Sequence, residues 1–471
     1  MKKILSTCLL IFGAMFTHAQ TITGTWYGTL KIPGSPLHVV FHITQNGGGF
    51  STTMDSPDQG ASGIATDKTS LIDNQLTIEA LKFAMSYTGR FKADSNKITG
   101  TFTQGASSFP LELTTSKPVD NKAAPAKRPQ DPESFPYRQE EVTFKNQKAG
   151  NVLAGTLTLP PGAKPKKVVI LISGSGPQDR NEEVAQFNHR PFLVWSDWLT
   201  RKGIAVLRYD DRGIGKSTGR FNLATSADFA DDVEAAIAYL QSRPDLKGTA
   251  IGLMGHSEGG MIAPMIAARN PVVRFVVLLA APGVPITELM VQQSKDQMRL
   301  SGAPENVIKQ SISSNTKLFA AMNRYKELPD AAFKVKMDTV IYQQLRATPK
   351  DALGGQSIEE IAKRTAGQLY APWFRYFISY RPASNLEKLR CPVLALNGTL
   401  DMQVQSAANL AGIKAALTKG GNKHFEIVPL PGLNHLLQQA TTGAGSEYAQ
   451  IDETVNLSAL TKASDWINQV K

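Results

Sequence analysis

The sequence is poor in cysteine, in long apolar stretches and in metal-binding spacings. Its 471 residues include only two cysteines, so a framework of several disulfides is excluded. Beyond the amino terminus, no stretch reaches the roughly 18 uninterrupted apolar residues of a membrane-spanning helix. No HExxH, paired CxxC or similar cluster occurs. We therefore expect no metal, no other cofactor and no stable membrane insertion.

The amino terminus has the features of a secretory signal peptide. Residues 1–19 begin with a basic Met-Lys-Lys sequence, continue with a short apolar run and end in Thr-His-Ala. This pattern predicts export to the periplasm or the outside of the cell, with cleavage near Ala19. Cys8 lies inside the removed segment, so the mature chain keeps Cys391 alone and forms no internal disulfide.

Acidic residues are outnumbered by basic ones, which gives a formal net charge of +11. The lysines and arginines are scattered, with no arginine-rich helix and no aromatic–basic motif. This distribution is typical of a solvated surface, and we expect no nucleic-acid partner. The chain is long enough for two or three domains.

The first part of the mature chain alternates like half-buried strands. In LHVVFHIT, residues 37–44, apolar side chains share one face, while His38 and His42 lie on the other. The pattern recurs, separated by Asn-Gly, Asp-Asn and Ser-Asn turn signals. Residues 20–115 therefore predict a small antiparallel β-sandwich or barrel. The two histidines lack nearby ligand partners, which favours solvated strand histidines over a metal site.

The rhythm changes after a segment rich in proline, lysine and alanine. Residues 116–138 have the composition of a linker. Beyond it, a hairpin is followed by continuous apolar strands that alternate with helical segments, such as KKVVILISG and then PFLVWSDWLTRKG. This order predicts a mostly parallel sheet covered by helices on both faces, over residues 139–471. Residues 285–385, helix-like and mixed in polarity, interrupt the alternation and predict a helical cap over the active-site edge.

One short motif in this second domain carries the chemistry. G-H-S-E-G, residues 255–259, stands between a predicted strand and a predicted helix, as does the nucleophile elbow G-x-S-x-G. Glycines fit where a sharp turn brings neighbouring backbone close, and the turn lifts the Ser257 hydroxyl clear of the sheet. The sequence therefore predicts that Ser257 is a nucleophile.

A serine nucleophile needs a base and an acid. Of the seven histidines, His435 lies just past the last core strand, where strand carboxyl ends gather, and it is the predicted base. His256 precedes the serine on the strand end and is expected to point away from it. Asp401 directly follows a strand between Ser257 and His435 in the chain, and we predict that it is the acid.

The oxyanion of acyl transfer needs fixed N–H donors. We expect one donor to be the backbone N–H of Glu258, directly after the nucleophile. The second is expected in the turn LISGSGPQDR, from Ser175 or, as second choice, Gly174. The Glu258 side chain is expected only to favour the helix amino terminus electrostatically.

Six motifs in order make the second domain resemble a known family. They are GSGPQDRN, RYDDRGIGKSTG, GHSEGG, APWFRYFISYRP, LNGTLDMQV and PGLNHLLQ. Residues 139–471 resemble secreted bacterial carboxylesterases of the serine-aminopeptidase-like type, which have the α/β-hydrolase fold. The resemblance implies that Ser257, Asp401 and His435 form a triad that hydrolyses carboxylic esters through an acyl-enzyme. Ser173 stands where many such enzymes begin the oxyanion loop with histidine.

The substrate is less defined by the sequence than the reaction. Phe374, Tyr376 and Phe377 in the insertion suggest an apolar wall, which favours a small-molecule ester with a short acyl chain. A serine exopeptidase or aminopeptidase would use the same triad on a peptide terminus. A secreted binding module that has lost its chemistry is the alternative from another class, and the complete Ser, Asp and His set argues against it.

Overall fold

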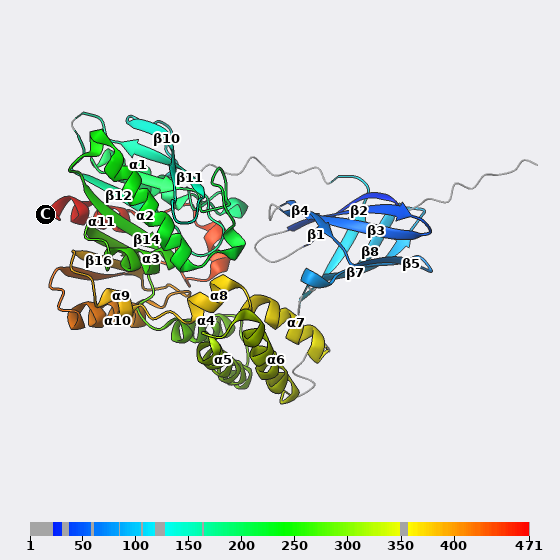
Figure 1. Cartoon of the computed structure of the whole chain (residues 1–471). Helices are drawn as coiled ribbons and strands as arrows, with labels where there is room; N and C mark the ends of the chain where they lie inside the picture. The colour runs from blue at the N-terminus through cyan, green and yellow to red at the C-terminus, as the bar shows by residue number, and fades with distance from the viewer. Residues whose placement is uncertain are drawn as a thin grey trace, which may run out of the picture. The chain divides into compact units, whose positions relative to one another are not determined.

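The computed structural model describes residues 22–30, 37–57, 61–83, 85–104, 107–117, 128–162, 164–348 and 357–470. The predicted signal peptide, residues 1–19, lies outside the described residues. The chain divides into two compact units, Met1–Asn121 and Lys122–Lys471 (Figure 1). We call them the β unit and the α/β unit. No helix in the described ranges is long and apolar enough to cross a membrane.

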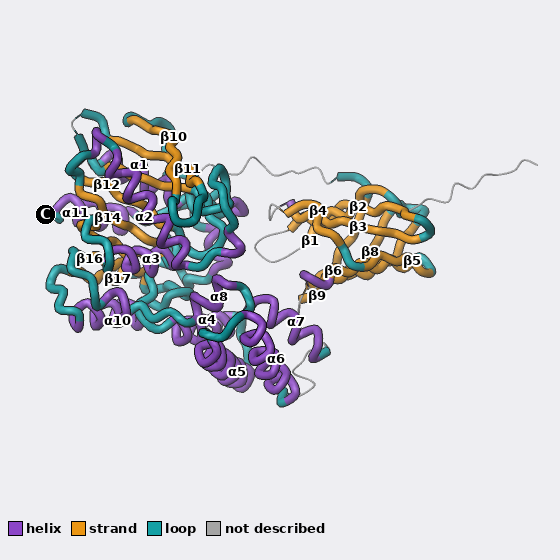
Figure 2. Tube along the Cα trace, in the orientation of Figure 1, coloured by secondary structure: helices purple, strands orange, loops and turns teal. Residues whose placement is uncertain are grey.

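The β unit is a single antiparallel sheet in the order β4-β3-β2-β1-β9-β8-β7-β6-β5, and it curls so that β3 approaches β5. Figure 2 shows these strands in orange. The strands are β1 (Gly24–Leu30), β2 (Leu37–Asn46), β3 (Gly49–Ser56), β4 (Ala61–Ala65), β5 (Lys68–Ile72), β6 (Gln75–Ala80), β7 (Met85–Lys92), β8 (Lys97–Gln104) and β9 (Ser107–Thr114). The expected antiparallel β domain is therefore present, as one curled sheet.

Alternating side chains give this sheet its inner face. Trp26 of β1, Phe41 of β2 and Tyr87 of β7 are fully buried in one apolar cluster. The buried Tyr87 hydroxyl donates to the Ile98 carbonyl at 3.1 Å, which satisfies a polar group that burial would otherwise penalise. The Asp-Asn turn signal marks the tight hairpin between β5 and β6.

The α/β unit holds an eight-stranded sheet in the order β10-β11-β13-β12-β14-β15-β16-β17. The hairpin β10–β11 pairs antiparallel with the rest, and the other strands run parallel to one another. The strands are β10 (Arg138–Lys145), β11 (Val152–Leu159), β12 (Lys167–Ile172), β13 (Ala205–Tyr209), β14 (Ala250–His256), β15 (Val273–Leu279), β16 (Val393–Gly398) and β17 (Phe425–Leu430). Because β12 to β16 are buried on both faces, their continuous apolar runs fit parallel strands.

Helices cover both faces of this sheet (Figure 1). The covering helices are α1 (Pro191–Arg201), α2 (Ser226–Ser242), α3 (Glu258–Ala267), α10 (Ser406–Lys419) and α11 (Leu457–Gln469). Side chains of α1 and α11 pack with Val169 and Leu171 of β12, whereas those of α2, α3 and α10 pack with Val168 and Ile170. Successive residues of β12 therefore serve opposite cores, as the period of a strand requires.

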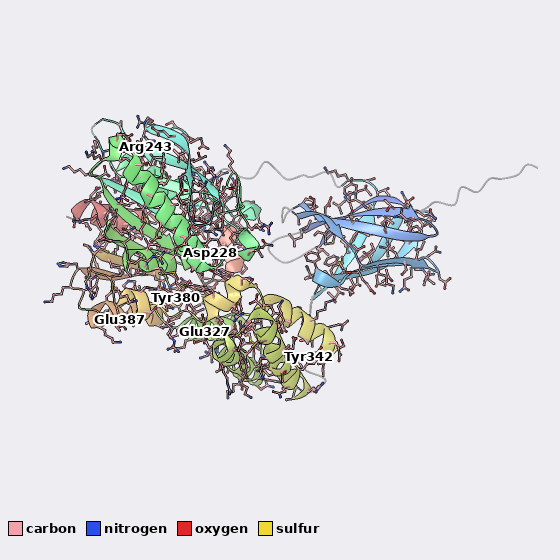
Figure 3. All side chains as sticks on the ribbon, viewed as in Figure 1. Asp228, Arg243, Glu327, Tyr342, Tyr380 and Glu387 are labelled. Carbon is pink, nitrogen blue, oxygen red and sulfur yellow. The ribbon has the colours of Figure 1, made fainter. Side chains whose placement is uncertain are left out.

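A helical insertion separates β15 from β16. Its helices are α4 (Ile286–Leu300), α5 (Glu305–Tyr325), α6 (Asp330–Arg346), α7 (Ile358–Leu369), α8 (Pro372–Ile378) and α9 (Ala383–Leu386). The two ends of the insertion meet where the Ile286 N–H donates to the Tyr380 carbonyl at 3.2 Å. The Tyr380 hydroxyl donates to the Met261 carbonyl of α3 at 3.4 Å, at the junction labelled in Figure 3.

Part of the predicted linker is held on the α/β unit. Arg128 donates to the Phe187 carbonyl at 2.8 Å, and Gln130 donates to the Val455 carbonyl at 2.6 Å. The Tyr137 hydroxyl donates to Asp197 at 2.8 Å. These contacts attach residues 128–138, part of the predicted linker, to the α/β unit.

Candidate active site

Ser257 occupies a sharp turn between β14 and α3. Its backbone has φ +52° and ψ −116°, a conformation that residues with a side chain rarely adopt. The surrounding glycines are required by space. A Cβ on Gly255 would lie 2.1 Å from the Gly259 carbonyl oxygen, and one on Gly259 would lie 2.1 Å from the Ile172 carbonyl oxygen. The sequence G-H-S-E-G thus allows a strand, a helix and the loop after β12 to converge on one serine. We call residues 173–180 of that loop the oxyanion loop, after their predicted role.

His435 and Asp401 form a buried pair at the same edge of the sheet. Asp401 follows β16 and His435 follows β17, and His435 Nδ1 lies 2.8 Å from Asp401 Oδ2. Their side chains are 4% and 0% exposed. The other carboxylate oxygen accepts the backbone N–H groups of Gln403 and Val404, both at 2.8 Å. These bonds fix the carboxylate, which in turn favours the His435 tautomer with a proton on Nδ1 and a free Nε2.

The turn with Ser257 and the loop with His435 contact each other through His256. The His256 and His435 ring centroids lie 4.9 Å apart, and His256 Nε2 lies 3.1 Å from the His435 carbonyl oxygen. A Cβ on Gly174 would lie 3.3 Å from the Ser257 Cβ, so the oxyanion loop borders the same point. The structure therefore gathers the predicted nucleophile, base, acid and oxyanion loop at the carboxyl ends of adjacent strands.

The two predicted oxyanion donors are left available. Glu258 is the first residue of α3, where N–H groups have no partner within the helix. In the described part of the chain, neither its N–H nor that of Ser175 donates to another group. Gly174, the second choice, instead donates its N–H to Glu182 Oε1 at 2.6 Å. Ser175 is therefore the better placed of the two candidates.

Asp211 and Glu182, neither of which was predicted as a site residue, hold the oxyanion loop through hydrogen bonds. Asp211 accepts the Ser173 hydroxyl at 3.0 Å and the Gln178 N–H at 3.1 Å. Burial raises the pKa of Asp211 well above its usual range. Ser173 thus anchors the loop to the segment that follows β13. The sequence signal that could have indicated Asp211 is its place in the RYDDRG motif, two residues after the end of β13.

The Glu258 side chain does more than the predicted electrostatic role at the helix terminus. It is 2% exposed, and it accepts the Ser226 hydroxyl at 2.5 Å and the indole N–H of Trp373 at 2.9 Å. Burial raises the pKa of this carboxyl. Ser226 begins α2 and Trp373 belongs to α8 of the insertion. The residue that follows Ser257 therefore connects the insertion to the turn between β14 and α3. We call this turn the catalytic turn, after its predicted role.

The sequence did not predict the partners of His256. His256 Nδ1 lies 2.9 Å from Glu182 Oε1 inside the α/β unit. His189 is also buried, with Nε2 2.9 Å from the Thr454 carbonyl oxygen, and burial lowers its pKa to about 4. In the β unit, His42 pairs with Asp55. The described residues contain no group of three or more His, Cys, Asp or Glu that could hold a metal ion.

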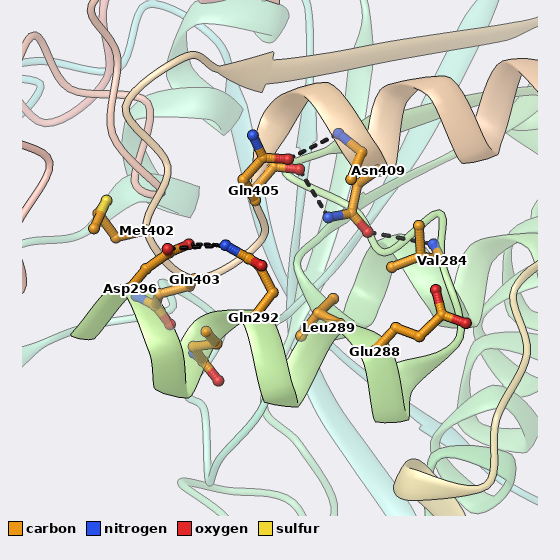
Figure 4. Close-up of a pocket in the computed structure, with 11 residues that line it drawn as sticks. Val284, Glu288, Leu289, Gln292, Asp296, Met402, Gln403, Gln405 and Asn409 are labelled. Atoms are coloured by element: carbon orange, nitrogen blue, oxygen red, sulfur yellow. Dashed lines mark hydrogen bonds between the residues drawn. The ribbon is translucent and has the colours of Figure 1, made fainter. Parts of the chain in front are cut away.

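A pocket lies beside Asp401, between α4 of the insertion and the loop and helix that follow β16 (Figure 4). Amide, carboxylate and apolar side chains share it. It is lined by Val284, Glu288, Leu289, Gln292, Gln293, Asp296, Met402, Gln403, Gln405, Ala408 and Asn409. Gln292 donates to Asp296 at 2.8 Å, and Asn409 accepts the Gly283 N–H at 2.8 Å. None of the lining residues is lysine or arginine.

The predicted apolar wall packs largely inside the insertion. Phe377 is 8% exposed and stacks on Trp373, with ring centroids 4.8 Å apart. Phe374 contacts Phe319 of α5 at 6.3 Å between centroids. These rings stabilise the insertion by burying aromatic area against its own helices.

Comparisons with known proteins identify relatives of the α/β unit. Residues 163–346 match the family model described as serine aminopeptidase, S33. The chain is 27% identical to Esterase EstD of Thermotoga maritima over 310 aligned residues. The aligned region covers 65% of this chain and 61% of EstD. The predicted resemblance to bacterial α/β-hydrolase esterases is confirmed. The α/β unit has the α/β-hydrolase fold. The chain spans about three-fifths of the length of EstD.

Solved structures are similar at a coarser level. The Pyrococcus furiosus esterase Pf2001 is 14% identical, with a TM-score of 0.41, and the match covers 71% of this chain and 91% of that one. Est1E of Butyrivibrio proteoclasticus, solved with ferulic acid, is 17% identical, with a TM-score of 0.39 and coverage of 70% and 98%. Scores this low carry no conclusion about the substrate of this chain.

Proposed function

We propose that the α/β unit is a serine hydrolase that cleaves carboxylic esters. The observation that carries this proposal is the buried His435–Asp401 pair at 2.8 Å, in a loop that contacts the catalytic turn beside Ser257. Such a pair positions an imidazole as a general base. The similarity to Esterase EstD supports an ester as the substrate.

The proposed reaction passes through an acyl-enzyme on Ser257. The Ser257 hydroxyl attacks the ester carbonyl while His435 Nε2 accepts its proton, and Asp401 stabilises the imidazolium. The N–H groups of Glu258 and Ser175 stabilise the oxyanion. His435 then returns the proton to the leaving alcohol. Water, deprotonated by His435, attacks the acyl-enzyme in turn, and the carboxylic acid is released with Ser257 restored.

The helical insertion serves as a cap over this site in the proposed arrangement. The support is the Trp373–Glu258 contact, because it joins α8 to the residue after the nucleophile. A cap limits the length of the acyl group that the site admits. We expect the highest kcat/KM on acyl chains of about two to six carbons, in a site that buries most of its ligand.

The pocket beside Asp401 is the proposed place for one arm of the ester. It contains Glu288 and Asp296 but no basic side chain, so a neutral arm is favoured over an anionic one. A graded panel of p-nitrophenyl esters, with a hemisuccinate as the anionic member, tests this preference. Equal kcat/KM for neutral and anionic esters of the same length would contradict it.

A serine aminopeptidase is the second candidate function. It is favoured by the S33 family description and by the two pocket carboxylates, which could bind a free α-amine. Aminoacyl and dipeptidyl p-nitroanilides, assayed beside the esters, separate the two functions. Ester turnover that exceeds anilide turnover supports the esterase, and the reverse order moves the protein to the peptidases.

Export is a separate proposal, and it depends on the signal-peptide pattern of residues 1–19. A protein exported and processed as proposed begins at Gln20 when it is recovered from outside the cytoplasm. Amino-terminal sequencing checks this. A mature protein that keeps its first residues after export would contradict cleavage near Ala19.

A further inference from the structure

A second histidine–carboxylate pair lies directly behind the proposed triad. His256 and Glu182 are 8% and 5% exposed, and His256 Nδ1 lies 2.9 Å from Glu182 Oε1. Neither residue has a role in the proposed acyl transfer. A buried charge is costly unless it is paired, so a pair in this position calls for an explanation.

The hydrogen-bond partners define the charge of the pair. His256 Nε2 faces the His435 carbonyl oxygen, which can only accept, and Nδ1 faces a carboxylate. Both ring nitrogens therefore donate when His256 is an imidazolium and Glu182 a carboxylate. Burial lowers the pKa of His256, but Glu182 and the His435 carbonyl outweigh that effect, so the pKa lies above its ordinary value.

Glu182 depends on this partner. Its Oε1 also accepts the Gly174 N–H at 2.6 Å, while its Oε2 is buried with no hydrogen-bond partner among the described residues. Its backbone has φ +52°, a strained conformation for a residue with a side chain. The carboxylate is thus held by one backbone N–H and one imidazole, both of which belong to catalytic loops.

The pair joins three segments that must keep their relative positions. Glu182 contacts the oxyanion loop at Gly174, and His256 is the residue before the nucleophile. His256 also donates to the backbone of His435. The nucleophile, the base and the oxyanion loop are therefore connected through two buried side chains. A displacement of about 1 Å among such groups can cost about 10²-fold in rate.

The pair lies directly beside the proposed base, since the His256 and His435 ring centroids lie 4.9 Å apart. A nearby cation disfavours protonation of a second imidazole. The other titratable groups around the pair are Asp401, Asp211 and His189, which lie in the loops after β16, β13 and β12.

We propose that the Glu182–His256 pair is a positioning device that aligns the oxyanion loop, Ser257 and His435. The inference rests on the proposed function, because it assigns these residues to the same reaction. His256 and Glu182 are positioning residues, and neither contacts the reacting atoms in this proposal.

The first test measures the charge state and needs no substrate. In the full chain with ¹⁵N-labelled histidine, NMR at about pH 7.5, roughly one unit above the ordinary histidine value, reports which imidazoles keep both ring protons. We expect His256 to be such an imidazole, identified by the signals that disappear in H256Q. If His256 is deprotonated with the other histidines at this pH, the ion pair is overturned. This readout stands even if the protein hydrolyses no ester.

The second test measures reactivity through labelling by a fluorophosphonate, a probe that reports the activated serine directly. We expect H256Q and E182Q to be labelled about 10- to 100-fold more slowly, with thermal unfolding checked for each variant. H256Q leaves the Glu182 carboxylate without its imidazole partner, so we expect the pH midpoint of the labelling rate to move about one pH unit higher. We expect a smaller change of this midpoint in E182Q. A purely structural role lowers Tm without this pH shift.

The matched control is H42Q in the β unit, which removes the other histidine that pairs with a carboxylate. We expect its labelling rate and pH profile to equal those of the wild type. Folded H256Q and E182Q that are labelled within about twofold of the wild-type rate, at every pH, would overturn the proposal. A wild-type protein that is labelled at Ser257 but hydrolyses no ester would contradict the proposed substrate and leave this test valid.

Discussion

Each of the two units of this chain contains a histidine that pairs with a carboxylate. In the β unit, Thr25 Oγ1 lies 3.2 Å from His42 Nδ1, and His42 Nε2 lies 2.8 Å from Asp55. In the α/β unit, His435 lies 2.8 Å from Asp401, in a loop that contacts the catalytic turn. The histidine–carboxylate distances are equal, so distance alone does not identify a catalytic pair.

The two histidine–carboxylate pairs differ in their burial and in the backbone around the nearby hydroxyl. The His42 and Asp55 side chains are 39% and 24% exposed, whereas those of His435 and Asp401 are 4% and 0% exposed. Water screens an exposed pair, and a buried pair acts at lower dielectric. Thr25 also lies within a regular strand, while Ser257 stands in a strained turn at a helix amino terminus. Ser257, unlike Thr25, directly precedes a helix whose first N–H groups have no partner within the helix.

The same contrast extends to buried charge in general. The buried polar side chains in the described part of the β unit are those of Thr52 and Ser56, both uncharged. The α/β unit buries Glu182, Asp211 and Glu258 around the catalytic turn. Because buried carboxylates are costly, their concentration at one sheet edge indicates where the chain gives up stability for function.

The largest expected effect comes from removing the nucleophile. We expect S257A to lower kcat by at least about 10³-fold on the best p-nitrophenyl ester, because the hydroxyl forms the acyl bond. Circular dichroism and Tm serve as the folding check. T25A in the β unit is the control, and it should keep wild-type kcat. A folded S257A with most of its activity would contradict the assignment.

Removing the acid distinguishes the two histidine–carboxylate pairs most sharply. We expect D401N to lower kcat by about 10²- to 10³-fold, because the amide no longer favours the His435 tautomer that accepts the serine proton. D55N, the equivalent change in the β unit, should alter kcat by less than about twofold. Steady-state kinetics on both variants checks this. Equal losses, or none in D401N, would place the acid elsewhere.

A smaller effect is expected at the contact between the insertion and the catalytic turn. E258Q places an amide NH₂ against donors from Ser226 and Trp373, and an unmatched buried group costs about 1–3 kcal/mol. We expect kcat/KM to fall about 10-fold, mainly through KM, because the backbone N–H remains. E305Q on exposed α5 is the control. An unchanged KM in E258Q would indicate that the insertion does not bind substrate.

Acid should destabilise the α/β unit through His189. Its pKa is about 4 in the folded state, below the ordinary value, so the unfolded chain binds more protons between about pH 6.5 and 4. The stability due to the neutral, buried ring is present above about pH 6.5 and is lost as the pH falls through 4. Urea unfolding at both pH values should show a loss of up to about 3 kcal/mol.

The variant H189Q isolates this contribution, since glutamine does not titrate. We expect the difference in unfolding free energy between the two pH values to shrink in H189Q. H38Q, on the β unit, should leave the pH dependence of the α/β unit unchanged. An identical pH dependence in H189Q and the wild type would contradict the role of His189.

The smallest expected effect is the loss of the β unit itself. A chain that begins at Lys122 should keep kcat/KM on small soluble esters within about threefold, because the α/β unit contains the whole proposed site. A chain that begins at Phe135 lacks Arg128 and Gln130, and its Tm should be lower by roughly 5 °C. An inactive chain from Lys122 would indicate that the β unit completes the site.

The sequence predicted the parts of the site that depend on short-range rules. The elbow at Ser257 follows from the steric needs of a turn, and Asp401 and His435 follow from the rule that parallel strand ends gather. The fold class follows from apolar runs that alternate with helical segments. These inferences need no knowledge of side-chain contacts.

The missed features depend on contacts between distant segments. Glu182 lies eight residues beyond Gly174 in a loop with no periodicity, so only its position in space reveals the bond to His256. The same holds for the Glu258–Trp373 contact, which joins residues 115 positions apart. The composition of residues 128–138 resembled a linker because composition does not record where polar side chains find their partners.

Labelling with a fluorophosphonate probe, followed by mass-spectrometric mapping of the modified residue, tests the central claim most directly. The claim is that Ser257 is a catalytic nucleophile served by the His435–Asp401 pair, and that Thr25, which lies beside the His42–Asp55 pair, is not a nucleophile. We expect one adduct per chain, on Ser257, absent from S257A and slowed in D401N but not in D55N. No adduct on the folded protein, or an adduct that persists in S257A, would contradict the claim.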